Sequence, residues 1–336
     1  MTPPAAEVAE VVALPPSYRI LPHSIPFRVP GFIKQSRPED RVLTPDACNC
    51  EHWFSAFADR VSNAVGSTFL PVCRMSDGEF FFLFGEQPPN LQLPVLKRII
   101  RTIRQNLGRV GRLFTGFHAA TAPGVSSGDF TPTEWRQYRA ILSQDFRSML
   151  DKGVLAIHLS YGKNPYREQY FPTINRWLSH SGHHLTTSNY VPFYFVYALL
   201  RGPRMSDLMT GRRVLLVHSA VGDKREAIAR SLSALKPRSI EWLQISPNRS
   251  FADTLHLHSI TNAPDICVVG AGIGKARIMM QLEPLNVPCI DAGYAFEVWA
   301  DPDRQWDRAF MTPDTAFDAA KIRFIRAEER ATFGVQ

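Results

Sequence analysis

Short apolar runs that alternate with amphipathic stretches limit this chain to a small set of folds. Residues 93–107, 131–150 and 222–237 repeat apolar side chains at helical spacing, which predicts helices. Strands that alternate with helices pair in parallel and are covered on both faces. We therefore predict an α/β, Rossmann-like fold with a mostly parallel sheet and helices on both faces. The runs typical of strands are residues 67–75, 154–160, 213–219, 239–245, 265–272 and 287–293.

Two of the predicted helices have clear start signals. Thr131 can cap a helix, Pro132 suits its first position, and Glu134 completes a capping box. Asp223 and Glu226 repeat the same spacing farther along the chain. Local sequence therefore predicts where these helices begin.

Proline content divides the chain. Nine of its 26 prolines precede Asp46, and such a density favours an extended segment. We expect residues 1–45 to form an extended proline-rich N-terminal arm. Residues 46–336 contain no internal repeat, and we expect them to form a single α/β domain.

Charge and cysteine content narrow the class of protein. The net charge of +7 suits an anionic ligand or surface, but the basic residues form no nucleic-acid stripe, so we expect no nucleic-acid partner. Five scattered cysteines predict a reducing compartment. The N-terminus lacks the pattern of a signal peptide, and no window is apolar enough for a membrane span. We expect a cytoplasmic protein, for which peripheral membrane association and a homo-oligomer both remain possible.

In open α/β sheets, ligands bind beyond the carboxyl ends of the strands. The residues that follow each predicted strand are therefore the candidates for a site. They are residues 74–79, 158–161, 218–222, 270–275 and 291–294.

The first of these segments, RMSDGE, contains two carboxylates around one glycine. Ser76 and Glu79 have the spacing of a capping box, and Asp77 in the first turn favours the helix dipole. Asp77 and Glu79, on either side of Gly78, can also converge on one hard cation, because carboxylate oxygens suit Mg²⁺ or Mn²⁺. The two interpretations are compatible, since a helix start beyond a strand is also where a phosphate binds.

The segment VVGAGIGKA follows a predicted strand and opens a helix. Lys275 stands where the third glycine of a dinucleotide fingerprint belongs, and the spacing of a Walker loop also fails. The pattern still predicts a glycine-rich turn, formed by Gly270, Gly272 and Lys275, whose backbone N–H groups can bind an anion. The alternative is a tight turn without a ligand. His256 and His258, by contrast, read as ordinary surface or core histidines.

The order of these motifs resembles that of the GT-D fold glycosyltransferases, a family that includes a glucosyltransferase of adhesin glycans. That family typically has R-x-G-D-G-E-F after its first strand, where this chain has Arg74 to Phe80. Its later motifs are similar to VVGAGIGKA, CIDAGY, FEVW, GRRVLLVHSA and the strand before SPNRSF. Ser76 replaces a glycine of the family, Tyr294 replaces a histidine, and His218-Ser219 replace Glu-Gly. The similarity covers roughly residues 63–300.

The resemblance implies a metal-dependent hexosyltransferase that uses a nucleotide-diphosphate sugar, such as a UDP-sugar. The implied acceptor is a glycan, a glycoprotein or a polysaccharide precursor. Asp77 and Glu79 would be catalytic and hold Mn²⁺ or Mg²⁺. The residues implied in donor binding are Arg74, Ser76, Gly78, His218, Ser219, Gly270, Gly272, Lys275 and Asp291.

Two other functions remain open from the residues alone. One is an NAD-type oxidoreductase that uses the turn from Gly270 to Gly274 together with Asp291. The other is a non-catalytic nucleotide-binding protein of a polysaccharide pathway.

Overall fold

The computed structural model describes most of the α/β region. The residues described are 21, 23–29, 41–75, 77–84, 118–119, 129–130, 132–157, 165–247 and 249–302. Ser76, residues 158–161 and the helix predicted at residues 93–107 lie outside this set. Asp77 and Gly78 are described by their backbone only.

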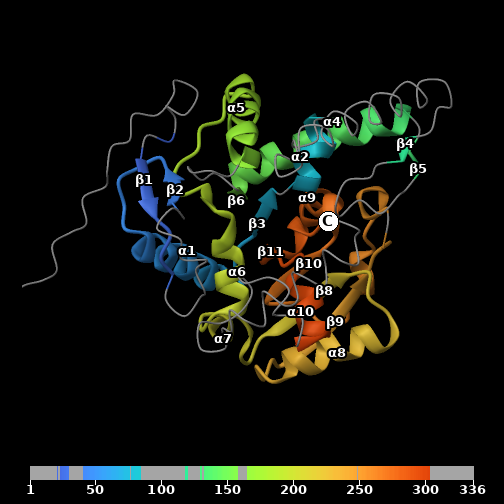
Figure 1. Cartoon of the computed structure of the whole chain (residues 1–336). Helices are drawn as coiled ribbons and strands as arrows, with labels where there is room; N and C mark the ends of the chain where they lie inside the picture. Colours follow the sequence, from blue (N-terminus) through green and yellow to red (C-terminus); the bar gives the residue numbers. More distant parts are fainter. Residues whose placement is uncertain are drawn as a thin grey trace, which may run out of the picture.

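A seven-stranded sheet forms the centre of the molecule (Figure 1). Each strand is parallel to its neighbours. The prediction of an α/β, Rossmann-like fold is therefore confirmed. In spatial order the strands are β7 (Tyr190–Pro192), β6 (Val154–Ile157), β3 (Leu70–Met75), β11 (Pro288–Asp291), β10 (Ile266–Gly270), β8 (Arg213–His218) and β9 (Ser239–Gln244).

Helices cover both faces of this sheet. On one face α2 (Asp77–Phe84), α4 (Pro132–Lys152) and α9 (Lys275–Gln281) pack together. On the other face α6 (Phe193–Arg201) and α8 (Gly222–Ser233) both contact α10 (Ala295–Ala300), as Figure 1 shows. The remaining described helices are α1 (Cys50–Ala64), α5 (Pro165–His180) and α7 (Met205–Met209).

The start of α4 agrees with the local signals in the sequence. This helix begins at Pro132, as the capping box predicts. Helix α2 begins at Asp77, directly after β3, so the first turn of α2 lies at the carboxyl edge of the sheet. This short connection brings Glu79 close to the end of β3.

Two strands lie within the segment expected to be an extended arm. β1 (His23–Pro26) and β2 (Arg41–Thr44) pair antiparallel. Ile25 and Leu43 are buried in the hydrophobic core, and the hydroxyl of Tyr190 donates a hydrogen bond to the carbonyl of Leu43 at 3.0 Å. The division of the chain into an arm and a domain stays a prediction, but these strands pack against the core.

Within the described residues, no helix combines the length and apolarity required to span a bilayer. All five cysteines are free thiols, and four of them are buried.

Candidate functional site

Four charged residues that the sequence predicts for the site lie close together in the structure. They come from the ends of two adjacent strands and from the starts of two helices. Arg74 lies near the end of β3, and Asp291 ends the neighbouring strand β11. Lys275 is the first residue of α9, and Glu79 lies in the first turn of α2. Because parallel strands end at the same edge, these side chains meet at the carboxyl edge of the sheet.

The four side chains form a chain of alternating charges, which we call the charged quartet. Arg74 donates from Nε to Oδ2 of Asp291 at 3.1 Å and from Nη2 to Oδ1 at 3.0 Å. The Nζ of Lys275 lies 2.9 Å from Oδ2 of Asp291 and 2.9 Å from Oε1 of Glu79. The backbone N–H of Arg74 also donates to Oδ2 of Asp291 at 3.2 Å. The quartet therefore links β3, β11, α9 and α2.

Burial makes this pairing necessary. Each residue of the quartet is at most 4% exposed, and a buried charge without a partner is strongly unfavourable. Burial alone would raise the pKa of Asp291, but Arg74 and Lys275 hold the pKa below its usual value. Burial alone would lower the pKa of Lys275, but Asp291 and Glu79 raise it above its usual value. Lys275 therefore stays a cation between two carboxylates.

Aromatic rings and one glycine complete the surroundings of Arg74. Its guanidinium lies 4.2 Å from the ring centroid of Tyr197 and 5.1 Å from that of Phe193, both on α6. Gly293 has a φ of +45°, and a Cβ atom there would lie 1.7 Å from Nη2 of Arg74. In the sequence Gly293 lies in the candidate segment 291–294 and in the CIDAGY motif, whereas no local signal points to Tyr197.

A second part of the site lies where the chain changes direction. After β8 the chain continues to β9, at the border of the sheet, whereas after β10 it continues to β11, toward the centre of the sheet. His218 and Gly270 end the neighbouring strands β8 and β10, so they flank a topological switch point. The ring of His218 stacks on Phe296, with centroids 4.2 Å apart. Its Nδ1 accepts a hydrogen bond from the backbone N–H of Ala220 at 2.9 Å. Ser219 beside it is half-buried.

The environment of His218 favours the neutral ring. Burial lowers its pKa to about 4, and Lys224 contributes in the same direction while Glu297 opposes it. Because Nδ1 accepts from the backbone, the proton of the neutral ring belongs on Nε2. His218 is thus a neutral hydrogen-bond donor at the switch point.

Packing accounts for the glycines of the predicted anion turn. A Cβ atom at Gly270 would lie 2.5 Å from Cδ2 of His218, and one at Gly274 would lie 2.4 Å from the backbone nitrogen of Phe251. Gly272 has a φ of +51°, which favours glycine. These contacts explain the glycines as parts of a tight turn, and a ligand at the turn stays a prediction.

The metal site also stays a prediction, because the side chain of Asp77 lies outside the described part of the chain. Within the described residues, no three His, Cys, Asp or Glu side chains cluster as metal ligands. The chemistry of the donors nevertheless fits a hard cation. Glu79 supplies a buried carboxylate, and its Oε1 forms an ion pair with the ammonium of Lys275.

Comparison with known proteins adds one distant likeness. No protein-family profile and no curated protein matches the sequence. A solved structure titled as a selenomethionine-substituted domain of unknown function 1792 (DUF1792) is 14% identical, with a TM-score of 0.40. The match covers 75% of this chain and 84% of that chain. A likeness of this degree carries no functional argument, so the motif resemblance to GT-D glycosyltransferases stays a prediction.

Proposed function

We propose that this protein is a metal-dependent glycosyltransferase that moves a sugar from a nucleotide-diphosphate donor to a glycan-type acceptor. The observation that carries the proposal is the charged quartet at the carboxyl edge of the sheet. Glu79 of the D-x-E motif meets Lys275 there, and Lys275 follows the glycine turn. A parallel sheet binds its ligands at this edge.

Asp77 and Glu79 are the residues that would hold the divalent cation. When bound, Mn²⁺ or Mg²⁺ would neutralise the charge that builds on the leaving nucleoside diphosphate. Glu79 can serve as a ligand if its carboxylate is shared between the cation and Lys275.

The other charged residues would hold Glu79 in place. Asp291 fixes the ammonium of Lys275, and Arg74 fixes the carboxylate of Asp291 through three hydrogen bonds, one of them from its backbone N–H. A rigid arrangement of this kind keeps a carboxylate oriented before the substrate arrives. His218 can donate a hydrogen bond from Nε2 to an oxygen of the nucleotide-diphosphate sugar, and its neutral ring adds no charge to the site.

The oxidoreductase alternative receives less support from the same geometry. A dinucleotide site needs a carboxylate that can accept hydrogen bonds from the ribose hydroxyls. Asp291 is 1% exposed, and both its oxygens already accept hydrogen bonds from Arg74. The glycines of the turn are also explained by packing.

Donor hydrolysis would test the proposal without a known acceptor. We expect slow release of UDP from a panel of UDP-sugars in the presence of Mn²⁺ and loss of that release in EDTA. Calorimetry with UDP should show weak binding without the cation, because Asp77 and Glu79 would otherwise repel a diphosphate. Equal affinity for UDP in EDTA, or tight metal-independent binding of NAD, would contradict the proposal.

A further inference from the structure

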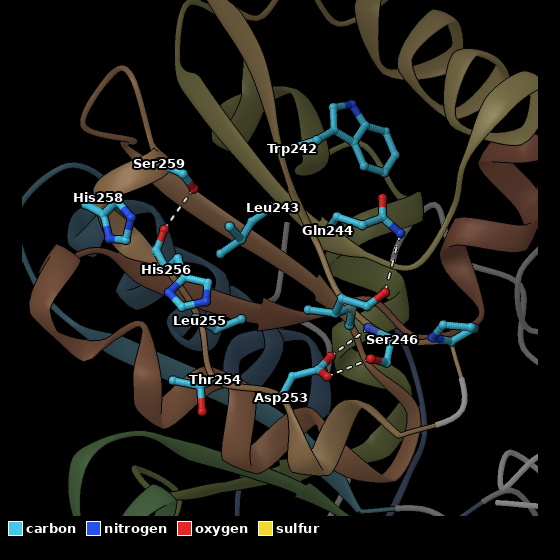
Figure 2. A pocket seen from close by; sticks show the side chains of 12 residues that line it. Trp242, Leu243, Gln244, Ser246, Asp253, Thr254, Leu255, His256, His258 and Ser259 are labelled. Atoms are coloured by element: carbon cyan, nitrogen blue, oxygen red, sulfur yellow. Dashed lines mark hydrogen bonds between the residues drawn. The ribbon is translucent and has the colours of Figure 1, made fainter.

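A cavity of about 850 Å³ opens beside the edge strand β9 (Figure 2). Residues 242–247 form one wall, and the segment 253–259 forms the other. We call it the β9 cavity. His256 and His258 lie on one side of it, and Trp242 and Gln244 lie on the other.

Hydrogen bonds fix both walls of the β9 cavity. The carboxylate of Asp253 accepts from the backbone N–H and from the hydroxyl of Ser246, each at 2.6 Å. From α9, Gln281 accepts from the N–H of Leu255 at 2.9 Å and donates to the carbonyl of Asp253 at 3.0 Å. The cavity is therefore preformed, which reduces the entropic cost of binding a ligand.

The lining of the cavity combines apolar and polar side chains, and few of them are ionisable. Apart from the histidines, Asp253 is the one ionisable residue that the structure describes in the lining, and Ser246 occupies both its oxygens. Gln244 and Thr254 add an exposed amide and an exposed hydroxyl. Such groups bind hydroxyl-rich neutral ligands and do not attract phosphates or carboxylates.

Two exposed rings add flat surfaces to this lining. The imidazoles of His256 and His258 have centroids 5.5 Å apart. A ring presents an apolar face and polar atoms at its edge, and a pyranose presents the same two features. The ring of Trp242 is half-buried, and the guanidinium of Arg225 lies 5.1 Å from its centroid. The histidines are therefore the main ring contacts of the cavity.

The β9 cavity and the candidate active site both lie at the carboxyl edge of the sheet. Gln244 is in register with His218, His218 with Gly270, and Val269 with Asp291. Adjacent strands lie about 4.8 Å apart, so Gln244 is roughly 14 Å from Asp291 along the edge. The cavity and the switch point at His218 and Gly270 therefore lie along the same carboxyl edge of the sheet.

We propose that the β9 cavity binds a neutral oligosaccharide and serves as the acceptor subsite of this protein. The proposal rests on the proposed glycosyltransferase function. The cavity supplies ring faces, an amide and hydroxyls, and it lies on the edge where the donor would bind.

Ligand-observed NMR with maltohexaose, cellohexaose and hexa-N-acetylchitohexaose would test the proposal on the full chain, with hexagalacturonate as the charged comparison. We expect at least one neutral hexaose to bind and the charged one not to bind. The double variant His256→Ala/His258→Ala should weaken binding about tenfold, because two ring contacts are lost. The control His180→Ala/His184→Ala removes two other histidines that are exposed outside the cavity and should bind normally.

The outcomes distinguish failure of the acceptor subsite from failure of the glycosyltransferase function. Failure of all three neutral sugars to bind, or equal weakening in the control, would overturn the acceptor subsite. So would loss of self-association in the double variant, because that result would assign the cavity to a second copy of the chain. Normal Mn²⁺-dependent hydrolysis of a UDP-sugar without oligosaccharide binding would remove the subsite alone. Oligosaccharide binding without hydrolysis would remove the donor chemistry and retain a carbohydrate site.

Discussion

Arg74 binds Asp291 through both carboxylate oxygens, at 3.1 Å from Nε to Oδ2 and 3.0 Å from Nη2 to Oδ1, and both residues are almost fully buried. The contact joins the ends of two neighbouring strands. It also fixes the carboxylate that holds Lys275. The stability of the protein and the geometry of the candidate site therefore depend on the same pair.

We expect Arg74→Met to lower the free energy of unfolding by about 3–5 kcal/mol, because it leaves a buried carboxylate without its main partner. Denaturant titration would measure this loss. Arg213→Met is a matched control, because Arg213 makes the same forked contact to Asp265 with a side chain that is 37% exposed. Its loss should be much smaller. Similar losses in the two variants would show that burial adds nothing to the Arg74 contact.

Gly293→Ala should be more harmful than an alanine at another left-handed glycine. A methyl group at residue 293 would lie 1.7 Å from Nη2 of Arg74, while a methyl group at Gly182, where φ is +72°, would have no atom within 4 Å. Gly182→Ala should cost about 1 kcal/mol from backbone strain alone. Gly293→Ala should cost about 2 kcal/mol more, because the guanidinium must also move. Thermal melting of both variants measures the difference.

Glu79→Gln should abolish most of the Mn²⁺-dependent hydrolysis of a UDP-sugar, because the amide is a poor ligand for a hard cation. It should also lower the free energy of unfolding by about 1–3 kcal/mol, because Lys275 loses one buried partner. Asp77→Asn should lose the same activity. Full hydrolysis in both variants would leave the D-x-E segment as a helix start alone.

Glu283→Gln is the control for these activity measurements. Glu283 pairs with Lys152 at 2.6 Å on the surface, where the two side chains are 40% and 43% exposed. The same chemical change there should leave both hydrolysis and melting near the wild type.

Asp145 should make the protein more stable as the pH falls through the weakly acidic range. Burial raises its pKa to about 6, and Arg277 opposes this shift. The folded state therefore binds more protons than the unfolded state between about pH 4 and about pH 6. Its carboxylate costs up to about 3 kcal/mol at neutral pH, and less to the extent that water screens it. Asp145→Asn should remove this gain on acidification, and denaturant titrations at several pH values would measure the slope.

The exposed Asp151 lies on the same helix as Asp145 and provides the matched substitution. Asp151→Asn removes an exposed carboxylate from the same helix and should change the slope less than Asp145→Asn does. An unchanged slope in Asp145→Asn would contradict the assignment to Asp145.

His218 should remain neutral from about pH 5 to about pH 8, because its folded pKa is about 4. The unfolded chain binds a proton at a higher pH, so this residue makes the fold less stable as the pH falls from about 6.5 toward about 4. NMR of the imidazole, assigned with His218→Gln, would show no titration shift over the neutral range. A midpoint near 6.5 would mean that the stacked site does not exclude the proton.

Local sequence was sufficient for the class of fold and for some of its boundaries. Apolar runs of strand length marked six of the seven strands of the sheet, all but β7, and a capping box marked the first residue of α4. These features depend on residues that are close in the chain, so periodicity and capping reveal them. The rule that ligands bind at strand ends then selected Arg74, Glu79, Lys275 and Asp291 without knowledge of the strand order.

Only the tertiary structure decided which of these charges meet. Arg74 and Asp291 are 217 residues apart in sequence, and their contact depends on β3 and β11 being neighbours in the sheet. Buried parallel strands all read as similar apolar runs, so local pattern does not encode their order. The burial of Leu43 within a proline-rich segment and the position of His256 beside β9 also depend on contacts between distant parts of the chain. Local pattern therefore did not reveal them.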